Sequence, residues 1–156
     1  MTTPTEAKLP RLAAEEIPAL QATLVELLDL SLDAKQAHWN VIGPGFKPVH
    51  VFLDELTDQY RDWYDTVAER MTAIGVSPDG RSATVAATSP LGTLPAGAIA
   101  DQAALAAMDE RVTLVASNIQ GRIDSLGDLD LATQDVFIEV LRGLEKQRWM
   151  LRAHRA

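Results

Sequence analysis

Four side chains in one stretch of the sequence have the types and spacing of metal ligands. His50 and Asp54 are four residues apart, and so are Asp65 and Glu69. Residues four apart on a helix share one face, and at about 100° per residue all four side chains fall within an arc of roughly 100°. Imidazole and carboxylate groups bind metals such as iron, zinc and manganese. The pattern predicts a helix that carries two chelating pairs on one face.

The two pairs are too far apart to bind one metal centre within a single chain. They are separated by about 15 residues, or roughly 22 Å of helix. Their positions are nevertheless symmetric about a point between Gln59 and Tyr60. If two copies of the helix cross antiparallel on a two-fold axis near that point, the histidine end of one copy faces the glutamate end of the other. Two identical shared sites would then form, one at each end of the contact.

A fifth candidate ligand, His38, precedes the turn formed by Gly43, Pro44 and Gly45. This turn allows His38 to lie beside the start of the next helix. Two imidazoles and three carboxylates, in a chain without cysteine, suit Fe(II), with zinc or manganese as competitors. The alternatives are that the acidic pairs form an ordinary solvated face and that the histidines are structural.

Four segments with apolar residues at three- and four-residue steps are expected to form the helices that position these ligands. They span about 15–42, 48–74 and 101–126, and a fourth follows residue 130. Asp101 and Asp130 are the expected N-caps of the last two. The link between the second and third segments contains three prolines and a short helix-compatible run near 83–87, and its length favours a crossover. The sequence therefore predicts an all-α four-helix bundle of the ferritin-like kind.

Length, charge and composition restrict the class of protein. The 156 residues, 47% of them apolar, suffice for one core, and we expect a flexible arm at 1–14 followed by one domain at 15–156. The net charge of −8 favours cations over nucleic acid as partners. Without cysteine there can be no disulfide or thiolate metal site. Since no stretch approaches the roughly 20 apolar residues of a membrane span, we expect no membrane contact and a cytoplasmic location.

Several motifs of this sequence together resemble one known family. They are Lys35-Gln-Ala-His38-Trp39-Asn40, Gly43 with Phe46, His50, Asp54, Asp65, Val67-Ala-Glu69-Arg-Met71, Asp130-Leu-Ala-Thr-Gln-Asp135 and Glu145-Lys-Gln-Arg-Trp149. In the order and spacing of all five ligand positions, the chain resembles the bacterial DNA-binding proteins from starved cells, the Dps family. The resemblance extends over most of the chain from the first helix onward.

The resemblance implies a hollow homo-dodecamer built from two-fold dimers. Such a particle takes up Fe(II), oxidises it preferentially with hydrogen peroxide and stores a ferric mineral, which protects DNA from oxidative damage. By the resemblance, the ferroxidase ligands are His38, His50 and Asp54 of one subunit with Asp65 and Glu69 of its two-fold mate.

The resemblance also implies a role for the tryptophan that follows the first histidine. Trp39 stands where the family has a tryptophan beside the iron site, and its indole could supply or accept an electron. The competing interpretation is that Trp39 packs the dimer interface. We expect Trp63 and Trp149 to be packing residues.

Further acidic residues match regions that line the three-fold pores of the family. They are Asp130 and Asp135, with Asp124 as a third candidate, and capping is an equally good explanation for Asp130. Glu55 and Asp58, next to the ligand face, could offer carboxylates to a growing mineral. Ordinary surface charge explains these two nearly as well.

We expect weak or absent DNA binding near neutral pH, because the first dozen residues carry only Lys8 and Arg11 as basic groups. Association with the nucleoid is left open. A dinuclear site could alternatively hydrolyse an amide or ester bond. A third reading is a structural bundle that binds no metal.

Overall fold

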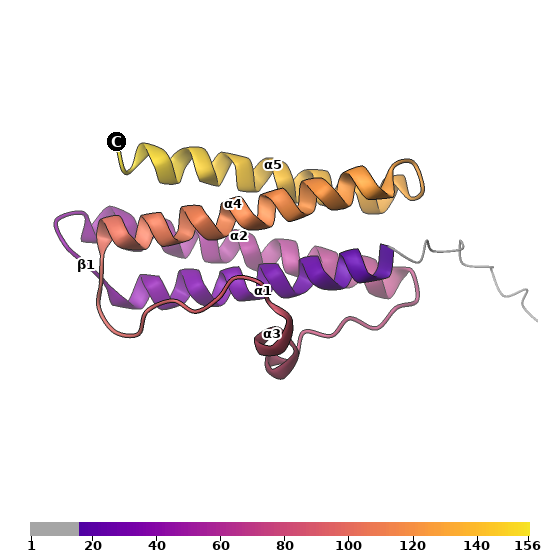
Figure 1. Cartoon of the computed structure of the whole chain (residues 1–156), viewed down its shortest axis with the longest axis horizontal. Coiled ribbons are helices and arrows are strands. Elements are labelled where there is room, and N and C mark those ends of the chain that lie inside the picture. Colours follow the sequence, from indigo (N-terminus) through magenta and orange to yellow (C-terminus); the bar gives the residue numbers. More distant parts are fainter. Residues whose placement is uncertain (1–15) are drawn as a thin grey trace, which may run out of the picture.

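Four long helices lie side by side in the computed structural model, which describes residues 16–156 (Figure 1). Their bounds are Glu16–Asn40 for α1, Phe46–Ala73 for α2, Asp101–Leu126 for α4 and Leu131–Ala153 for α5. The predicted all-α four-helix bundle is therefore confirmed. The arm expected at 1–14 lies outside the described residues. No helix within 16–156 combines the length and apolarity needed to cross a membrane.

The helices α2 and α4 run parallel to each other and are joined by a long connection. Figure 1 shows that the connection runs back along the bundle from the end of α2, so α4 begins at the end where α2 begins. It carries one short helix, α3, at Ser82–Thr88, close to the helix expected at 83–87. Val85 is the buried residue of α3. The expected crossover is thus confirmed, and it leaves α1 and α2 as one antiparallel pair and α4 and α5 as another.

The core is formed by one apolar face of each long helix. On α1, Leu20, Leu27 and Leu30 have no exposed surface, and on α4 and α5 the same is true of Leu105 and Phe137. Burying a side chain of this size contributes about 1.5–3 kcal/mol. The opposite faces of the helices remain available for chemistry and contacts.

The turn between α1 and α2 is held by a residue far away in the sequence. The strand β1 (Val41–Ile42) pairs in parallel with β2 (Ile99–Ala100). The Gly45 backbone N–H donates a 2.6 Å hydrogen bond to the Asp101 carboxylate. A Cβ atom on Gly43 or Gly45 would lie within 3.0 Å of that carboxylate. Asp101 is the first residue of α4 and not its N-cap, which is Ala100, so this expected cap was wrong; its carboxylate instead fixes the turn.

The N-cap expected for the last helix is confirmed. The Asp130 carboxylate accepts hydrogen bonds from the backbone N–H groups of Ala132 and Thr133, at 3.0 and 3.2 Å. Trp63 also packs against the core, as expected. In contrast, Trp149 is 68% exposed within the chain. Trp149 therefore does not pack against the core of its own subunit, and the expectation is wrong for the single chain.

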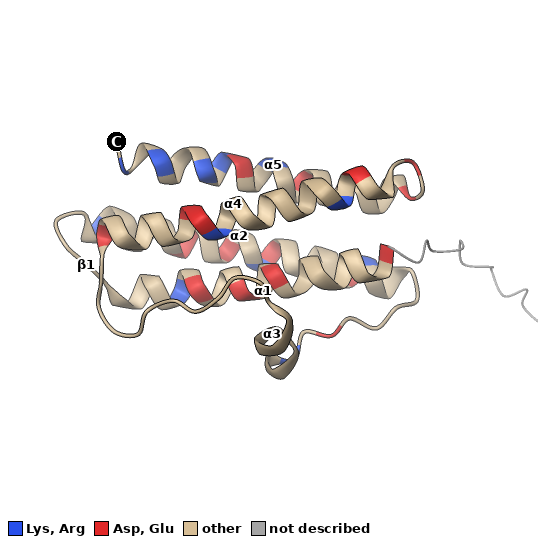
Figure 2. Cartoon of the chain, viewed as in Figure 1, with Lys and Arg blue, Asp and Glu red and all other residues tan. Residues whose placement is uncertain are grey.

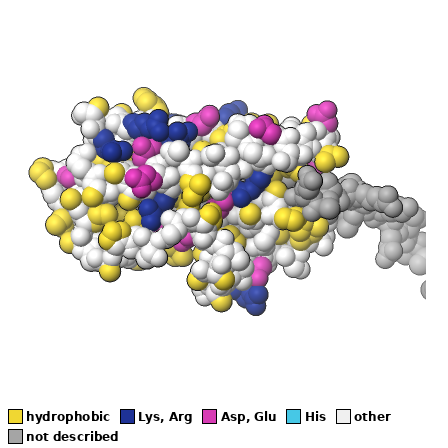
Figure 3. All heavy atoms as spheres, viewed as in Figure 1, with side chains coloured by type: hydrophobic (Ala, Val, Ile, Leu, Met, Phe, Trp, Pro, Cys, Tyr) yellow, Lys and Arg dark blue, Asp and Glu magenta, His cyan; other side chains and the backbone are white. Residues whose placement is uncertain are grey.

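Charge is unevenly distributed along the bundle. Figure 2 shows Lys and Arg concentrated on the C-terminal half of α5, and Asp and Glu on each of the long helices. In the space-filling view the same basic side chains gather at the upper left (Figure 3). Arg152 of α5 and Arg155, just after the end of α5, contact Asp109 of α4 at 3.3 and 3.4 Å. The bundle therefore has a locally basic region within an acidic chain.

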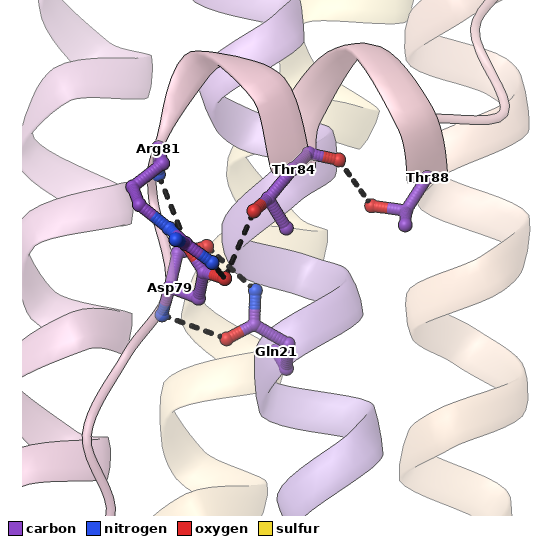
Figure 4. A network of polar contacts seen from close by, with 5 residues as sticks. All are labelled: Gln21, Asp79, Arg81, Thr84 and Thr88. Atoms are coloured by element: carbon purple, nitrogen blue, oxygen red, sulfur yellow. Dashed lines mark hydrogen bonds and ion pairs between the residues drawn. The ribbon is translucent and has the colours of Figure 1, made fainter.

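The crossover is attached to α1 by a polar network (Figure 4). Gln21 of α1 donates to the Asp79 carbonyl at 2.8 Å and accepts from the Asp79 N–H at 2.9 Å. The Asp79 carboxylate accepts hydrogen bonds from Arg81 and Thr84, which hold the pKa of this carboxyl well below its usual range. Thr88 closes the last turn of α3 by donating to the Thr84 carbonyl. The network fixes the position of α3 against α1.

A helical glycine sets how closely α2 and α5 approach, and replacing it should destabilise the bundle. A Cβ atom on Gly143 would lie 2.1 Å from Cζ2 of Trp63. We expect Gly143→Ala to lower the unfolding midpoint, because overpacking costs about 1–3 kcal/mol and exceeds the roughly 1 kcal/mol gained in helix propensity. Gly121→Ala is the control, since a Cβ atom there meets nothing within 4 Å. A Gly143→Ala variant as stable as Gly121→Ala would contradict this packing.

Candidate metal site

The two candidate histidines meet where α1 ends and α2 begins. Their rings stack with centroids 3.7 Å apart and planes inclined by 16°. His38 Nδ1 lies 2.7 Å from the His50 carbonyl oxygen, and His50 Nδ1 lies 2.8 Å from the His38 carbonyl oxygen. Because a carbonyl oxygen only accepts, each Nδ1 carries the proton. In the neutral form of each ring, Nε2 then has the free lone pair with which imidazole binds a metal.

Neighbouring groups fix the orientation of this histidine pair. His38 is only 9% exposed. The Phe46 ring stacks on the His50 ring at a centroid distance of 5.0 Å. The Gly43–Gly45 turn, held by Asp101, brings both histidines together. The predicted approach of His38 to the start of the next helix is therefore confirmed.

Asp54, one turn after His50, is already paired with a cation. Its carboxylate accepts a hydrogen bond and ion pair from the Lys35 ammonium group. This hydrogen bond lowers the pKa of Asp54 below its usual value, so the carboxylate stays ionised. No role for Lys35 was expected from the sequence. Its position one helical turn before His38 is the feature of the sequence that could have indicated a place near the site.

Asp65 and Glu69 lie on the exposed face of α2. Neither side chain forms a hydrogen bond or ion pair with another residue in 16–156. Across that same part of the chain, no three His, Asp or Glu side chains are grouped to hold a metal ion. Each chain thus presents a histidine half-site and a separate carboxylate pair.

Trp39 follows the first histidine but points away from the core. Its side chain is 68% exposed. It borders a half-open groove of about 410 Å³ together with Lys35, Arg61 and Tyr64. Trp39 is therefore accessible to a partner or an oxidant next to the Lys35–Asp54 pair. Its redox and packing roles both remain predictions.

Of the acidic residues expected to line pores, Asp130 instead forms contacts within its own chain. Besides its capping bonds, it pairs with Arg70. Burial alone would raise the pKa of Asp130, but hydrogen bonds from Glu16, Thr133 and Arg70 together hold it below its usual range. Burial also raises the pKa of Glu16. Sequence reasoning missed Glu16 and Arg70 because their contact with Asp130 joins three distant segments.

The remaining proposed acidic residues lie at the surface of the chain. Asp124 accepts a 2.9 Å hydrogen bond from Gln120. Asp135, Glu55 and Asp58 are exposed. Their pore and mineral roles stay predictions.

The Lys35–Asp54 pair should compete with metal binding. We expect Lys35→Met to raise the affinity for Fe(II), measured without oxidant, by about 1.5- to 5-fold, since exposed ion pairs contribute roughly 0.2–1 kcal/mol. Loss of the ammonium group also raises the pKa of Asp54. As the pH is lowered, Fe(II) binding should therefore begin to weaken at a higher pH than in the unaltered protein. Lys47→Met, at an exposed position of α2, is the control for charge. Equal affinities in the two variants would show that Lys35 does not compete.

The fold agrees with comparisons to known proteins. The family model of the ferritin-like domain matches residues 17–156. The chain is 36% identical to the DNA protection during starvation protein of Mycolicibacterium smegmatis, over 91% of this chain and 78% of that one. It is 38% identical to the fine tangled pili major subunit of Haemophilus ducreyi, over 87% and 72%. The structure of Dps from Microbacterium arborescens in the high iron form superposes with a TM-score of 0.87 at 36% identity, covering 94% and 97%.

The four-helix bundle with its central crossover thus defines a ferritin-like protein. Within that class, the chain belongs to the Dps family.

Proposed function

We propose that this protein is a ferroxidase and iron-storage protein whose metal sites are shared between two copies of the chain. The proposal rests mainly on the stacked pair of His38 and His50, with Asp54 one helical turn after His50 on the same helix. Within residues 16–156, no further carboxylate is grouped with these histidines. Asp65 and Glu69 are symmetrically placed on the same helix to supply carboxylates from a two-fold partner.

The substrates of the proposed reaction are Fe(II) and hydrogen peroxide. Two Fe(II) ions, one peroxide molecule and two protons give two Fe(III) ions and two water molecules. Anionic carboxylates stabilise Fe(III) more than Fe(II) and thereby favour the loss of an electron. Because two neighbouring ions supply both electrons, peroxide is reduced without release of a hydroxyl radical.

The storage function requires more than a dimer. We propose that two-fold dimers assemble into a hollow dodecamer that retains the ferric product, in the cytoplasm. DNA would be protected mainly by removal of iron and peroxide. Tight DNA binding is not expected, because the chain carries a net charge of −8 and two C-terminal arginines contact Asp109.

Rapid oxidation kinetics combined with particle mass test this proposal. We expect Fe(II) to be consumed faster with peroxide than with oxygen, at about two Fe(II) per peroxide, by a particle of twelve chains. Turnover of an amide or ester substrate without consumption of Fe(II) would instead support the hydrolase alternative. Absence of metal binding by the purified protein would support a structural bundle.

A further inference from the structure

Asp101, the first residue of α4, has a carboxylate that is stabilised by backbone groups. The residue is 8% exposed. Its Oδ2 accepts a 2.6 Å hydrogen bond from the Gly45 N–H, and its Oδ1 accepts a 2.7 Å hydrogen bond from the Gln102 N–H. No Lys, Arg or His within 16–156 forms an ion pair with it. Each oxygen therefore has its own backbone donor, one on either side of the contact between α4 and the α1–α2 turn.

This position requires both carboxylate oxygens. An asparagine offers one acceptor oxygen, and its amide group donates instead of accepting. In place of Asp101, one end of the asparagine side chain would therefore face a backbone N–H that it cannot pair with. Leaving a buried donor unpaired is costly. The contact thus depends on the carboxylate itself and not only on the size of the side chain.

Gly45 is suited to this contact by its lack of a side chain. Its φ of −88° and ψ of 13° do not lie in the left-handed region that favours glycine. A Cβ atom at this position would, however, lie 2.8 Å from Oδ2 of Asp101. The requirement for glycine at position 45 therefore comes from the approach of Asp101, which is 56 residues away in the sequence.

The turn held in this way carries both candidate histidines. His38 lies just before the turn and His50 just after it, and the Nδ1 atom of each lies 2.7–2.8 Å from the carbonyl oxygen of the other. The strand β1 in the same turn pairs with β2, which directly precedes Asp101. Figure 1 shows the crossover ending beside this turn. Because metal ligands tolerate displacements of only about 0.2 Å, a shift of the turn would separate the histidines from their binding geometry.

We propose that Asp101 is a positioning residue for metal binding. Its carboxylate holds Gly45 in place and thereby keeps His38 and His50 in the arrangement that a metal ion needs. The inference rests on the proposed function in taking the two histidines as ligands. It adds a coupling between the metal site and the end of the crossover. Because such coupling is reciprocal, metal binding stabilises the contact between Asp101 and Gly45 by the same factor.

The first test measures Co(II) binding by visible absorption, without any oxidation step. We expect Asp101→Asn to raise the dissociation constant for Co(II) by about tenfold, at the low end of the 10- to 100-fold effect of residues that orient metal ligands. A general loss of stability is controlled for by Arg122→Ala, which removes the cation of buried Glu26 and lies roughly 30 Å from Asp101 along α4. This control should lower the thermal midpoint and leave Co(II) binding unchanged. An unchanged dissociation constant in Asp101→Asn would overturn the proposal.

A second pair of variants keeps the proposal testable if Asp101→Asn does not fold. Gly45→Ala keeps the carboxylate but displaces it, so this variant should weaken Co(II) binding as well. In a chain that already carries Asp101→Ala, the same Gly45→Ala change should cost nothing further, because the carboxylate that its Cβ atom would meet is gone. Multiplying effects of the two changes would show that they act independently, and this result would also overturn the proposal.

Hydrogen exchange of the peptide spanning 41–50 separates this inference from the proposed function. In metal-free protein, Asp101→Asn should speed the exchange of the Gly45 N–H, and Co(II) should slow that exchange in the unaltered protein. Faster exchange in the variant with unchanged Co(II) affinity would overturn the inference and leave the proposed function standing. An unaltered protein that binds no Co(II) would overturn the proposed function and this inference with it.

Discussion

Replacing Asp65 and Glu69 together with alanine should lower the rate of iron oxidation at least about tenfold, since even indirect changes around a metal site typically cost 10- to 100-fold. Both side chains are exposed and form no hydrogen bond or ion pair within the described chain, so the subunit should fold normally. The rate is measured by rapid mixing of Fe(II) with peroxide, with particle mass as the control for assembly.

The same variant allows a test of sharing between subunits. A second variant carries His50→Ala and Asp54→Ala, and the two are co-expressed. In a mixed dimer, one site receives intact halves from the two chains and the other site receives neither. Random pairing therefore restores about a quarter of the sites. Activity of the mixture no higher than that of the separate variants would contradict a shared site.

Removing Arg122 should have the largest effect on stability. Glu26 is 2% exposed, and Arg122 donates to both of its carboxylate oxygens at 2.5 and 2.9 Å. Asn118 donates to the same carboxylate at 2.8 Å. Arg122→Ala leaves a buried carboxylate without its cation, which typically costs about 3–5 kcal/mol. At roughly 2–4 °C per kcal/mol for a chain of this size, the thermal midpoint should fall by about 10 °C.

Two further variants serve as controls for Arg122→Ala. Arg81→Ala removes an ion pair whose arginine side chain is 80% exposed, and such pairs contribute about 0–1 kcal/mol. Replacing Glu26 and Arg122 together with Leu and Met should recover much of the loss, because no charge is then left buried. If Arg122→Ala unfolds at the same temperature as Arg81→Ala, the buried pair is not a major contributor to stability.

The sequence predicted those features that depend on local patterns. Apolar spacing located all four long helices to within a few residues, and the proline-rich link indicated the crossover. The N-cap role of Asp130 follows from residue type at a helix start. The approach of His38 to His50 follows from two helices joined by a turn that contains two glycines.

The features that the sequence did not predict depend on contacts between distant segments. The Asp101 carboxylate binds the Gly45 backbone across 56 positions, and nothing in its immediate neighbours indicates this. The two-residue pairing of β1 with β2 is too short to leave a pattern. The Lys35–Asp54 ion pair depends on how two helices pack. Trp149 resembles a core residue by type, and only the fold shows that it lies outside.

The most direct test of the central claim, a metal site shared by two copies of α2, is a crystal structure of the protein loaded with Zn(II) as a stable substitute for Fe(II). Anomalous scattering should place zinc on the Nε2 atoms of His38 and His50, with Glu69 of the partner subunit among its other ligands. A zinc ion bound only by residues of one chain, or histidines far from any partner, would contradict the account.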